Sequence, residues 1–173
     1  MTDGPPIEPT LPAGGARGAG TSLSVVEIVD PAERSRTCDR ILRSLPEWFG
    51  IAEAVDAYVR EVAALRTLAC EDAGFLALKT HSPYAAEIHV MGVLRERQGQ
   101  GIGTALVAAA EERLRGEGVE YLQVKTLGPS RPSAPYERTR AFYEKVGFRP
   151  LEEIHGLWSE GNPCLVMVKR LPS

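Results

Sequence analysis

A glycine-rich segment is the part of this chain whose residue types point most directly to chemistry. It runs Gln98-Gly99-Gln100-Gly101-Ile102-Gly103 and follows the apolar residues 88–93. Glycine permits backbone conformations with positive φ and lets a ligand approach the main chain closely. The first amides of a helix have no partner within the helix, and the helix dipole adds positive charge there. The segment therefore predicts an anion site, suited to phosphate, at a helix N-terminus.

Two common nucleotide-binding motifs do not match this segment. The glycines are spaced Gly-x-Gly-x-Gly rather than Gly-x-Gly-x-x-Gly, and Thr104 follows Gly103 without the lysine of a P-loop. A helix after the loop is well supported, because one stripe collects Ile102, Leu106, Val107, Ala110 and Leu114. A tight turn that needs glycine for its shape alone stays open as an alternative.

A second motif places the loop in a wider pattern. Residues 139–148 read TRAFYEKVGF, an amphipathic segment that ends in Tyr-x-x-x-Gly-Phe. Together with the spacing of residues 93–103, this segment resembles the two hallmark motifs of the GNAT superfamily of N-acetyltransferases. The specific part of the resemblance covers residues 87–148, and a looser match in the order of elements covers residues 24–171.

The resemblance implies an α+β (mixed α/β) fold with a mixed, mostly antiparallel sheet of about six to seven strands, flanked by helices. The strands before and after the glycine-loop helix would run parallel and splay apart at a bulge, and the pantetheine arm of CoA would lie in the gap. Gly92 is compatible with such a bulge, although close packing would also explain it. The cofactor-binding residues implied are Met91, Gly92, Val93, Leu94, Gln98, Gly99, Gln100, Gly101, Ile102, Gly103 and Thr104.

The activity that the resemblance implies is direct transfer of an acetyl group from acetyl-CoA to a primary amine of a small molecule or peptide, with no metal. An inactive acyl-CoA-binding sensor or regulatory module is the alternative. Such a transfer requires that the amine lose a proton, that the carbonyl oxygen find a donor, and that the departing thiolate gain a proton.

Two residues are candidates for the proton transfers. By resemblance, Tyr143 lies near the CoA sulfur, where a phenol with a pKa near 10 suits protonation of a thiolate; packing beside Phe142 is the alternative. Glu87, 11 residues before Gln98, stands where protein-lysine acetyltransferases of the superfamily carry a general base. We expect partial burial to raise its pKa toward neutrality. His89 would leave the same face of the strand, and deprotonation through water alone stays open.

Some positions depart from the superfamily pattern. Tyr136 stands where an asparagine is frequent, and its phenol would contact CoA in place of the amide. Gln98 replaces a frequent arginine but keeps a donor for pyrophosphate. By resemblance the acceptor side is bordered by four aromatic residues and two glutamates: Trp48, Phe49, Tyr84, Trp158, Glu152 and Glu153. The two carboxylates there would suit a cationic amine.

The elements that position these residues follow from periodicity and turn signals. Strands are predicted at 25–29, 65–70, 75–80, 86–93, 121–127, 151–155 and 164–169, and helices at 30–43, 51–61, 102–116 and 136–146, with a proline-rich loop at 128–135. Residues 1–22 lack any apolar periodicity and are predicted to be a disordered tail. Residues 23–173 would form one domain.

Composition excludes several classes of function. With 23 acidic against 20 basic residues, nothing in the composition indicates a basic face for nucleic acid. No apolar run is long enough to predict a membrane span, and no signal peptide is recognisable, so we expect a cytoplasmic monomer or homodimer. Cys38, Cys70 and Cys164 lack metal-ligand spacing and are predicted to be buried thiols.

Overall fold

The computed structural model describes residues 23–172, so the predicted tail lies outside the described residues. The elements are β1 (Val25–Ile28), α1 (Pro31–Arg43), α2 (Ala52–Val62), β2 (Arg66–Cys70), β3 (Gly74–Ser82), β4 (Ala85–Val93), the 3₁₀ turn η1 (Arg95–Arg97), α3 (Ile102–Gly116), β5 (Tyr121–Leu127), α4 (Ala134–Lys145), β6 (Arg149–Ser159) and β7 (Asn162–Arg170). Within residues 23–172, no helix is both long and apolar enough to cross a membrane.

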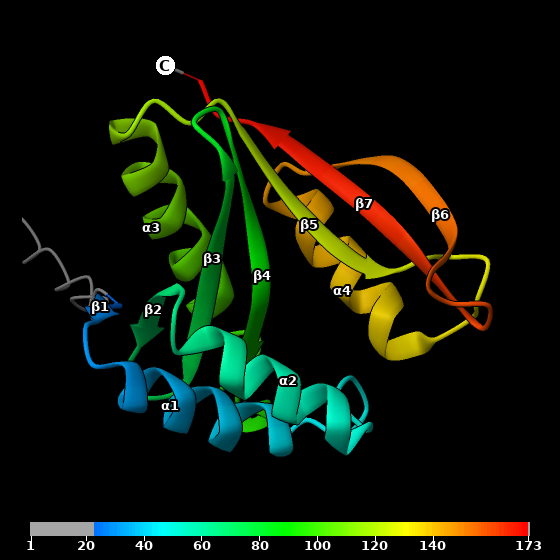
Figure 1. The fold of residues 1–173 in the computed structure, drawn as a ribbon, viewed down its shortest axis with the longest axis horizontal. Coiled ribbons are helices and arrows are strands. Elements are labelled where there is room, and N and C mark those ends of the chain that lie inside the picture. Colours follow the sequence, from blue (N-terminus) through cyan, green and yellow to red (C-terminus); the bar gives the residue numbers. More distant parts are fainter. Residues whose placement is uncertain (1–22, 173) are drawn as a thin grey trace, which may run out of the picture.

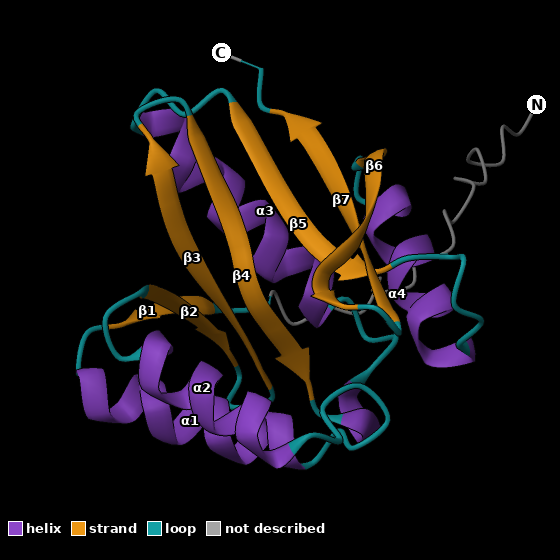
Figure 2. Ribbon diagram, turned by 45° about the vertical axis from the view of Figure 1, so that its right-hand side comes forward, coloured by secondary structure: helices purple, strands orange, loops and turns teal. Residues whose placement is uncertain are grey.

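The strands form one seven-stranded sheet in the order β1-β2-β3-β4-β5-β7-β6. Only β4 and β5 pair in parallel, and all the other neighbours are antiparallel. Helices α1 and α2 cover one face, whereas α3 and α4 lie on the other (Figure 2). The α+β fold class, the strand number and the mostly antiparallel arrangement predicted from the sequence are confirmed.

The sheet divides between β4 and β5. The two strands pair only over Ala85–Ile88 and Tyr121–Val124 and then diverge (Figure 1). The bulge lies on β4, because Ala77 pairs with Val90 and Leu78 with Ile88, which leaves His89 as the extra residue.

Of the two explanations left open for Gly92, a bulge and close packing, the structure supports close packing. Gly92 pairs regularly with Phe75 on β3. A Cβ atom at Gly92 would lie 2.9 Å from Cγ2 of Ile41, so this glycine allows close packing of the sheet against α1. Glycine in a strand serves bulges and close approaches alike, and the sequence cannot separate the two.

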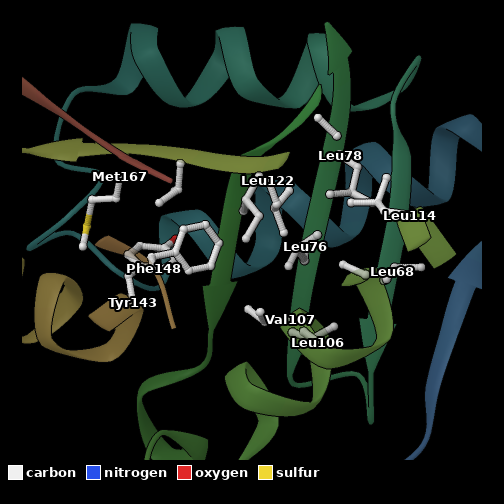
Figure 3. Close-up of a cluster of buried hydrophobic side chains, with 14 of the residues drawn as sticks. Leu68, Leu76, Leu78, Leu106, Val107, Leu114, Leu122, Tyr143, Phe148 and Met167 are labelled. Atoms are coloured by element: carbon white, nitrogen blue, oxygen red, sulfur yellow. The ribbon is translucent and has the colours of Figure 1, made fainter. Parts of the chain in front are cut away.

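Two hydrophobic clusters hold the helices on the sheet. The larger one, shown in Figure 3, packs α3 against the sheet around fully buried side chains such as Leu106 and Leu122, and Tyr143 and Phe148 lie side by side at its edge. The smaller one joins α1 and α2 to the opposite face. The three cysteines are buried and unpaired, as predicted.

Several predicted boundaries shift, most of them by one or two residues and the end of β6 by four. Helix α4 begins at Ala134, two residues before the predicted start, because Pro135 fits the first turn of a helix, where its missing N–H is not needed. Strand β6 continues to Ser159 because it pairs with β7 close to the turn, where Ser159 lies opposite Asn162. Trp158 therefore lies on a strand.

Candidate active site

The splay between β4 and β5 opens into a cleft of about 490 Å³. Its walls come from both halves of the sheet, from the glycine-rich loop, from α4 and from the segment between α1 and α2. Regular strand pairing stops at this point, so backbone groups on the facing edges of β4 and β5 remain available to a ligand.

The glycines of the loop have two different functions. Gly99 and Gly101 have φ angles of +76° and +85°, and Gly101 caps the N-terminus of α3. Gly103 is helical, and a Cβ atom there would lie 3.1 Å from Cζ of Phe142 on α4. The first two glycines therefore turn the chain into α3, and the third lets α4 pack closely against it.

Nine of the eleven predicted cofactor-binding residues line the cleft. The two exceptions are Leu94, whose N–H donates to the carbonyl oxygen of Ala73 and whose side chain packs into the core, and Gln100, whose amide bonds Arg97 and the carbonyl oxygen of Glu96. The Gln98 amide donates to the carbonyl oxygen of Val93 at 3.1 Å, which places it at the exposed end of β4.

A buried hydroxyl without a partner faces this cleft. Thr126, near the end of β5, is 3% exposed, and its Oγ1 has no hydrogen-bond partner among residues 23–172. An unsatisfied buried polar group costs about 1–3 kcal/mol. A polar ligand in the gap between β4 and β5 would satisfy it.

Tyr143 lies in the cleft wall and is 5% exposed. Its ring packs edge-on against Phe142 and Phe148, with centroids 5.3 and 5.4 Å away. Burial raises the pKa of its phenol above the ordinary value. The hydroxyl makes no hydrogen bond within the described part of the chain, so it is available to a ligand.

The hydrogen-bond partners of Glu87 differ from the surroundings that we expected. It is 5% exposed and does not line the cleft, and its Oε2 accepts from Lys125 Nζ (2.6 Å), Gln123 Nε2 (2.9 Å) and the imidazole of His81 (2.6 Å). Burial favours a higher pKa, but the hydrogen bonds from Lys125, Gln123 and His81 outweigh it and lower the pKa. The expected rise of this pKa was therefore wrong, because the sequence does not reveal that Lys125 lies alongside.

His89, the bulge residue, does line the cleft. Its Nε2 lies 2.6 Å from Oε2 of Glu61 on α2, and its ring meets the edge of Tyr58 at 5.5 Å. An ionised carboxylate only accepts hydrogen bonds, so Nε2 carries the hydrogen that points to Glu61, and Nδ1 is the ring nitrogen left for other partners. Glu87 and His89, which were predicted to lie on the same face of the strand, therefore belong to two separate hydrogen-bond networks.

Hydrogen bonds connect the segment after α1 to α4 at the edge of the cleft. Trp48, from the segment after α1, donates through Nε1 to Oγ1 of Thr139 on α4 at 2.9 Å. Tyr136 donates to the carbonyl oxygen of Trp48 at 2.8 Å. The phenol of Tyr136 is therefore engaged by the protein, and not free to replace the asparagine amide toward CoA as expected.

The comparison with protein families matches this geometry. Residues 58–150, more than half of the chain, match the family model described as the acetyltransferase (GNAT) domain. The chain belongs to the GNAT acetyltransferase family. The matched range includes β4, the glycine-rich loop, β5 and α4, and so every element that forms the gap and the glycine-rich turn.

Individual proteins resemble this GNAT chain in sequence or in structure. The mycothiol acetyltransferase of Beutenbergia cavernae is 36% identical over 74 residues, which span 43% of this chain and 23% of that protein. A GNAT-family structure from Desulfovibrio desulfuricans superimposes with a TM-score of 0.74 at 20% identity, over 87% of this chain and all of that one. An aminoglycoside 6'-N-acetyltransferase complexed with coenzyme A gives a TM-score of 0.68 at 19% identity, over 87% of this chain and 98% of that one. At these identities the two structures show the fold alone.

The remaining cleft residues of this GNAT chain were partly missed by the sequence analysis. Trp48, Phe49 and Trp158 of the predicted acceptor side line the cleft, but Tyr84, Glu152 and Glu153 do not. The side chains that the structure adds include Tyr58, Arg97, Lys125, Thr126, Arg138 and Thr139. None of these residues occupies a characteristic position of a recognisable sequence motif. Only the alternation of side chains along β5 could have indicated that Thr126 is buried and that Lys125 points to the opposite face.

Proposed function

We propose that this chain is an acetyl-CoA-dependent N-acetyltransferase that transfers an acetyl group directly to a primary amine of a small molecule or peptide. The observation that carries the proposal is the single cleft that joins the glycine-rich turn, the β4–β5 gap and Tyr143. The coenzyme A bound to one neighbour and the acetyltransferase names of the relatives support the same conclusion.

The residues of the cleft suit the cosubstrate. The backbone amides at the start of α3, which follow Gly99 and Gly101 in the sequence, would hold the pyrophosphate. Lys145, one turn beyond Phe142 on α4, lines the same end of the cleft and adds positive charge. The unpaired Thr126 hydroxyl lies deeper, where the polar pantetheine arm would satisfy it. When bound, the cosubstrate supplies an activated acetyl thioester.

Side chains of the protein would donate and accept the protons of the reaction. Tyr143, kept protonated by burial, would donate from Oη to the departing thiolate. His89, with Nε2 held by Glu61, presents Nδ1 as the proton acceptor for the amine, directly or through water. Glu87 as the base stays a prediction, and its three donors favour a supporting position beside Lys125.

The decisive experiment is acetyl-CoA turnover with a panel of primary amines, read as CoA release and as the mass of the acetylated amine. The expected result is amine-dependent release with no acetylated protein, because no cysteine among the described residues is exposed as a nucleophile. Acetyl-CoA binding by calorimetry without turnover on any amine would instead establish the alternative, an acyl-CoA sensor.

The proton acceptor is tested by pH profiles of two matched variants. His89→Gln should remove the acidic limb of kcat/KM, whereas Glu87→Gln should leave that limb in place with a smaller change in rate. The reverse pattern would assign the base to Glu87. Wild-type profiles for both variants would leave ordered water as the acceptor.

A further inference from the structure

The charge of the cleft is unlike that of the chain as a whole. The protein carries a net charge of −3, yet none of the cleft-lining side chains in residues 23–172 is aspartate or glutamate. The charged side chains that line it are Arg97, Lys125, Arg138 and Lys145, all of them basic. Overall composition therefore does not explain this distribution.

The cationic residues fall into two groups along the cleft. Arg97 and Lys145 lie near the glycine-rich turn, where phosphate charge would be neutralised under the proposed function. Lys125 and Arg138 lie elsewhere, on β5 and in the first half of α4. Arg138 has its guanidinium 5.9 Å from the ring centre of Trp48 and no carboxylate within salt-bridge distance in the described residues. Lys125 keeps its ion pair with Glu87 at 2.6 Å, whereas Arg138 has none among residues 23–172, and both side chains line the part of the cleft that remains for the acceptor.

The acceptor side is also aromatic. It lies on the face of the sheet that carries α1 and α2, because α3 and the glycine-rich turn occupy the other face. Tyr58 packs edge-on against Phe49 at 6.1 Å and against His89 at 5.5 Å, and Trp158 lines the cleft from β6. Ring faces and edges of this kind favour a flat apolar group.

Carboxylates near the cleft are already engaged by cations or by imidazole. Glu61 holds His89 at 2.6 Å, Glu87 holds Lys125 at 2.6 Å, and Glu47 pairs with Arg95. None of them is left to receive a second ammonium group. A neighbouring cation also disfavours the charged form of an amine, so Arg138, whose charge no carboxylate pairs with in residues 23–172, would lower the pKa of the bound acceptor and assist its deprotonation.

We infer that the acceptor is a primary amine that carries a flat aromatic group and one acidic group, and no second positive charge: the chemistry of an aromatic α-amino acid. Lys125 has two N–H groups beyond the one given to Glu87, and these can bind an acceptor carboxylate. The inference rests on the proposed N-acetyltransferase function and names the substrate class of the same site.

The test compares kcat/KM, corrected for the fraction of free amine, for L-phenylalanine, phenethylamine, propylamine, spermidine and kanamycin. Phenylalanine should exceed phenethylamine, phenethylamine should exceed propylamine, and spermidine and kanamycin should fall at least tenfold below phenylalanine. A preference for spermidine or kanamycin, or equal values for phenylalanine and propylamine, would overturn the inference and leave the proposed function standing. No turnover of these five amines or of the wider amine panel, peptides included, would refute the proposed function itself.

A charge reversal supplies an independent measurement. Arg138 is exposed on α4, so Arg138→Glu should fold and should shift the phenylalanine-to-spermidine ratio at least tenfold toward spermidine. Arg170→Glu makes the same change in net charge at the end of β7, outside the cleft, and should leave the ratio unchanged. The KM for acetyl-CoA, measured in parallel, shows whether the substitution instead affects binding of the cosubstrate. An unchanged ratio in folded Arg138→Glu would contradict the inference.

Discussion

Tyr143→Phe separates chemistry from packing more cleanly than any other change in the cleft. The substitution removes only the hydroxyl and keeps the ring contacts with Phe142 and Phe148. The hydroxyl makes no hydrogen bond within residues 23–172, so its loss leaves no partner unsatisfied. We therefore expect the free energy of unfolding to change by about 0.5 kcal/mol or less.

The rate should respond much more strongly. Loss of a general acid typically slows turnover about 100-fold, which is about 2.7 kcal/mol on the barrier at 1.36 kcal/mol for each tenfold step. The acid must be protonated to act, and burial raises the pKa of Tyr143. The wild-type enzyme should therefore show no loss of kcat from this group below its ordinary pKa of about 10.

The assay is kcat from CoA release at saturating amine and acetyl-CoA, with the Kd of acetyl-CoA from calorimetry and a denaturant titration of both proteins. Tyr121→Phe, an exposed tyrosine outside the cleft, is the matched control and should behave as wild type. A folded Tyr143→Phe variant with wild-type kcat would refute the role. Equal losses in acetyl-CoA binding and in rate would mark Tyr143 as structural.

Other substitutions test the loop, the ion pair and the packing. Gly101→Asp should abolish acetyl-CoA binding in calorimetry by placing negative charge at the α3 N-terminus, whereas Gly118→Asp, with a similar φ of +80° at the other end of α3, should bind normally; equal binding by both would remove the anion site. Glu87→Gln should lower the free energy of unfolding at pH 7 by about 1–3 kcal/mol. Because the folded-state pKa of Glu87 is lowered, this difference should be full above the unfolded value of about 4.3 and should shrink as the pH falls below it, and a constant difference across pH would exclude the ion pair as its cause. Gly92→Ala should destabilise by about 1–3 kcal/mol in urea unfolding through overpacking against Ile41, and a neutral result would show that α1 yields there.

The fold and the position of the glycine-rich turn could be predicted from the sequence alone. Periodicity located every strand and helix within a few residues, because each element buries one face of its own segment. The glycines at 99 and 101 were readable because only a residue without Cβ adopts positive φ readily. The paired motifs at 93–103 and 139–148 then indicated the family that the comparisons show.

Tertiary structure alone decided the electrostatics of the site. The pKa of Glu87 depends on Lys125 and Gln123, which lie on a strand more than thirty residues away and are brought alongside by the parallel pairing of β4 with β5. His89 becomes the bulge residue only because Ile88 and Val90 keep register with β3. Pairing register and the alignment of distant strands are set by the whole sheet, so no local pattern reveals which charges will meet.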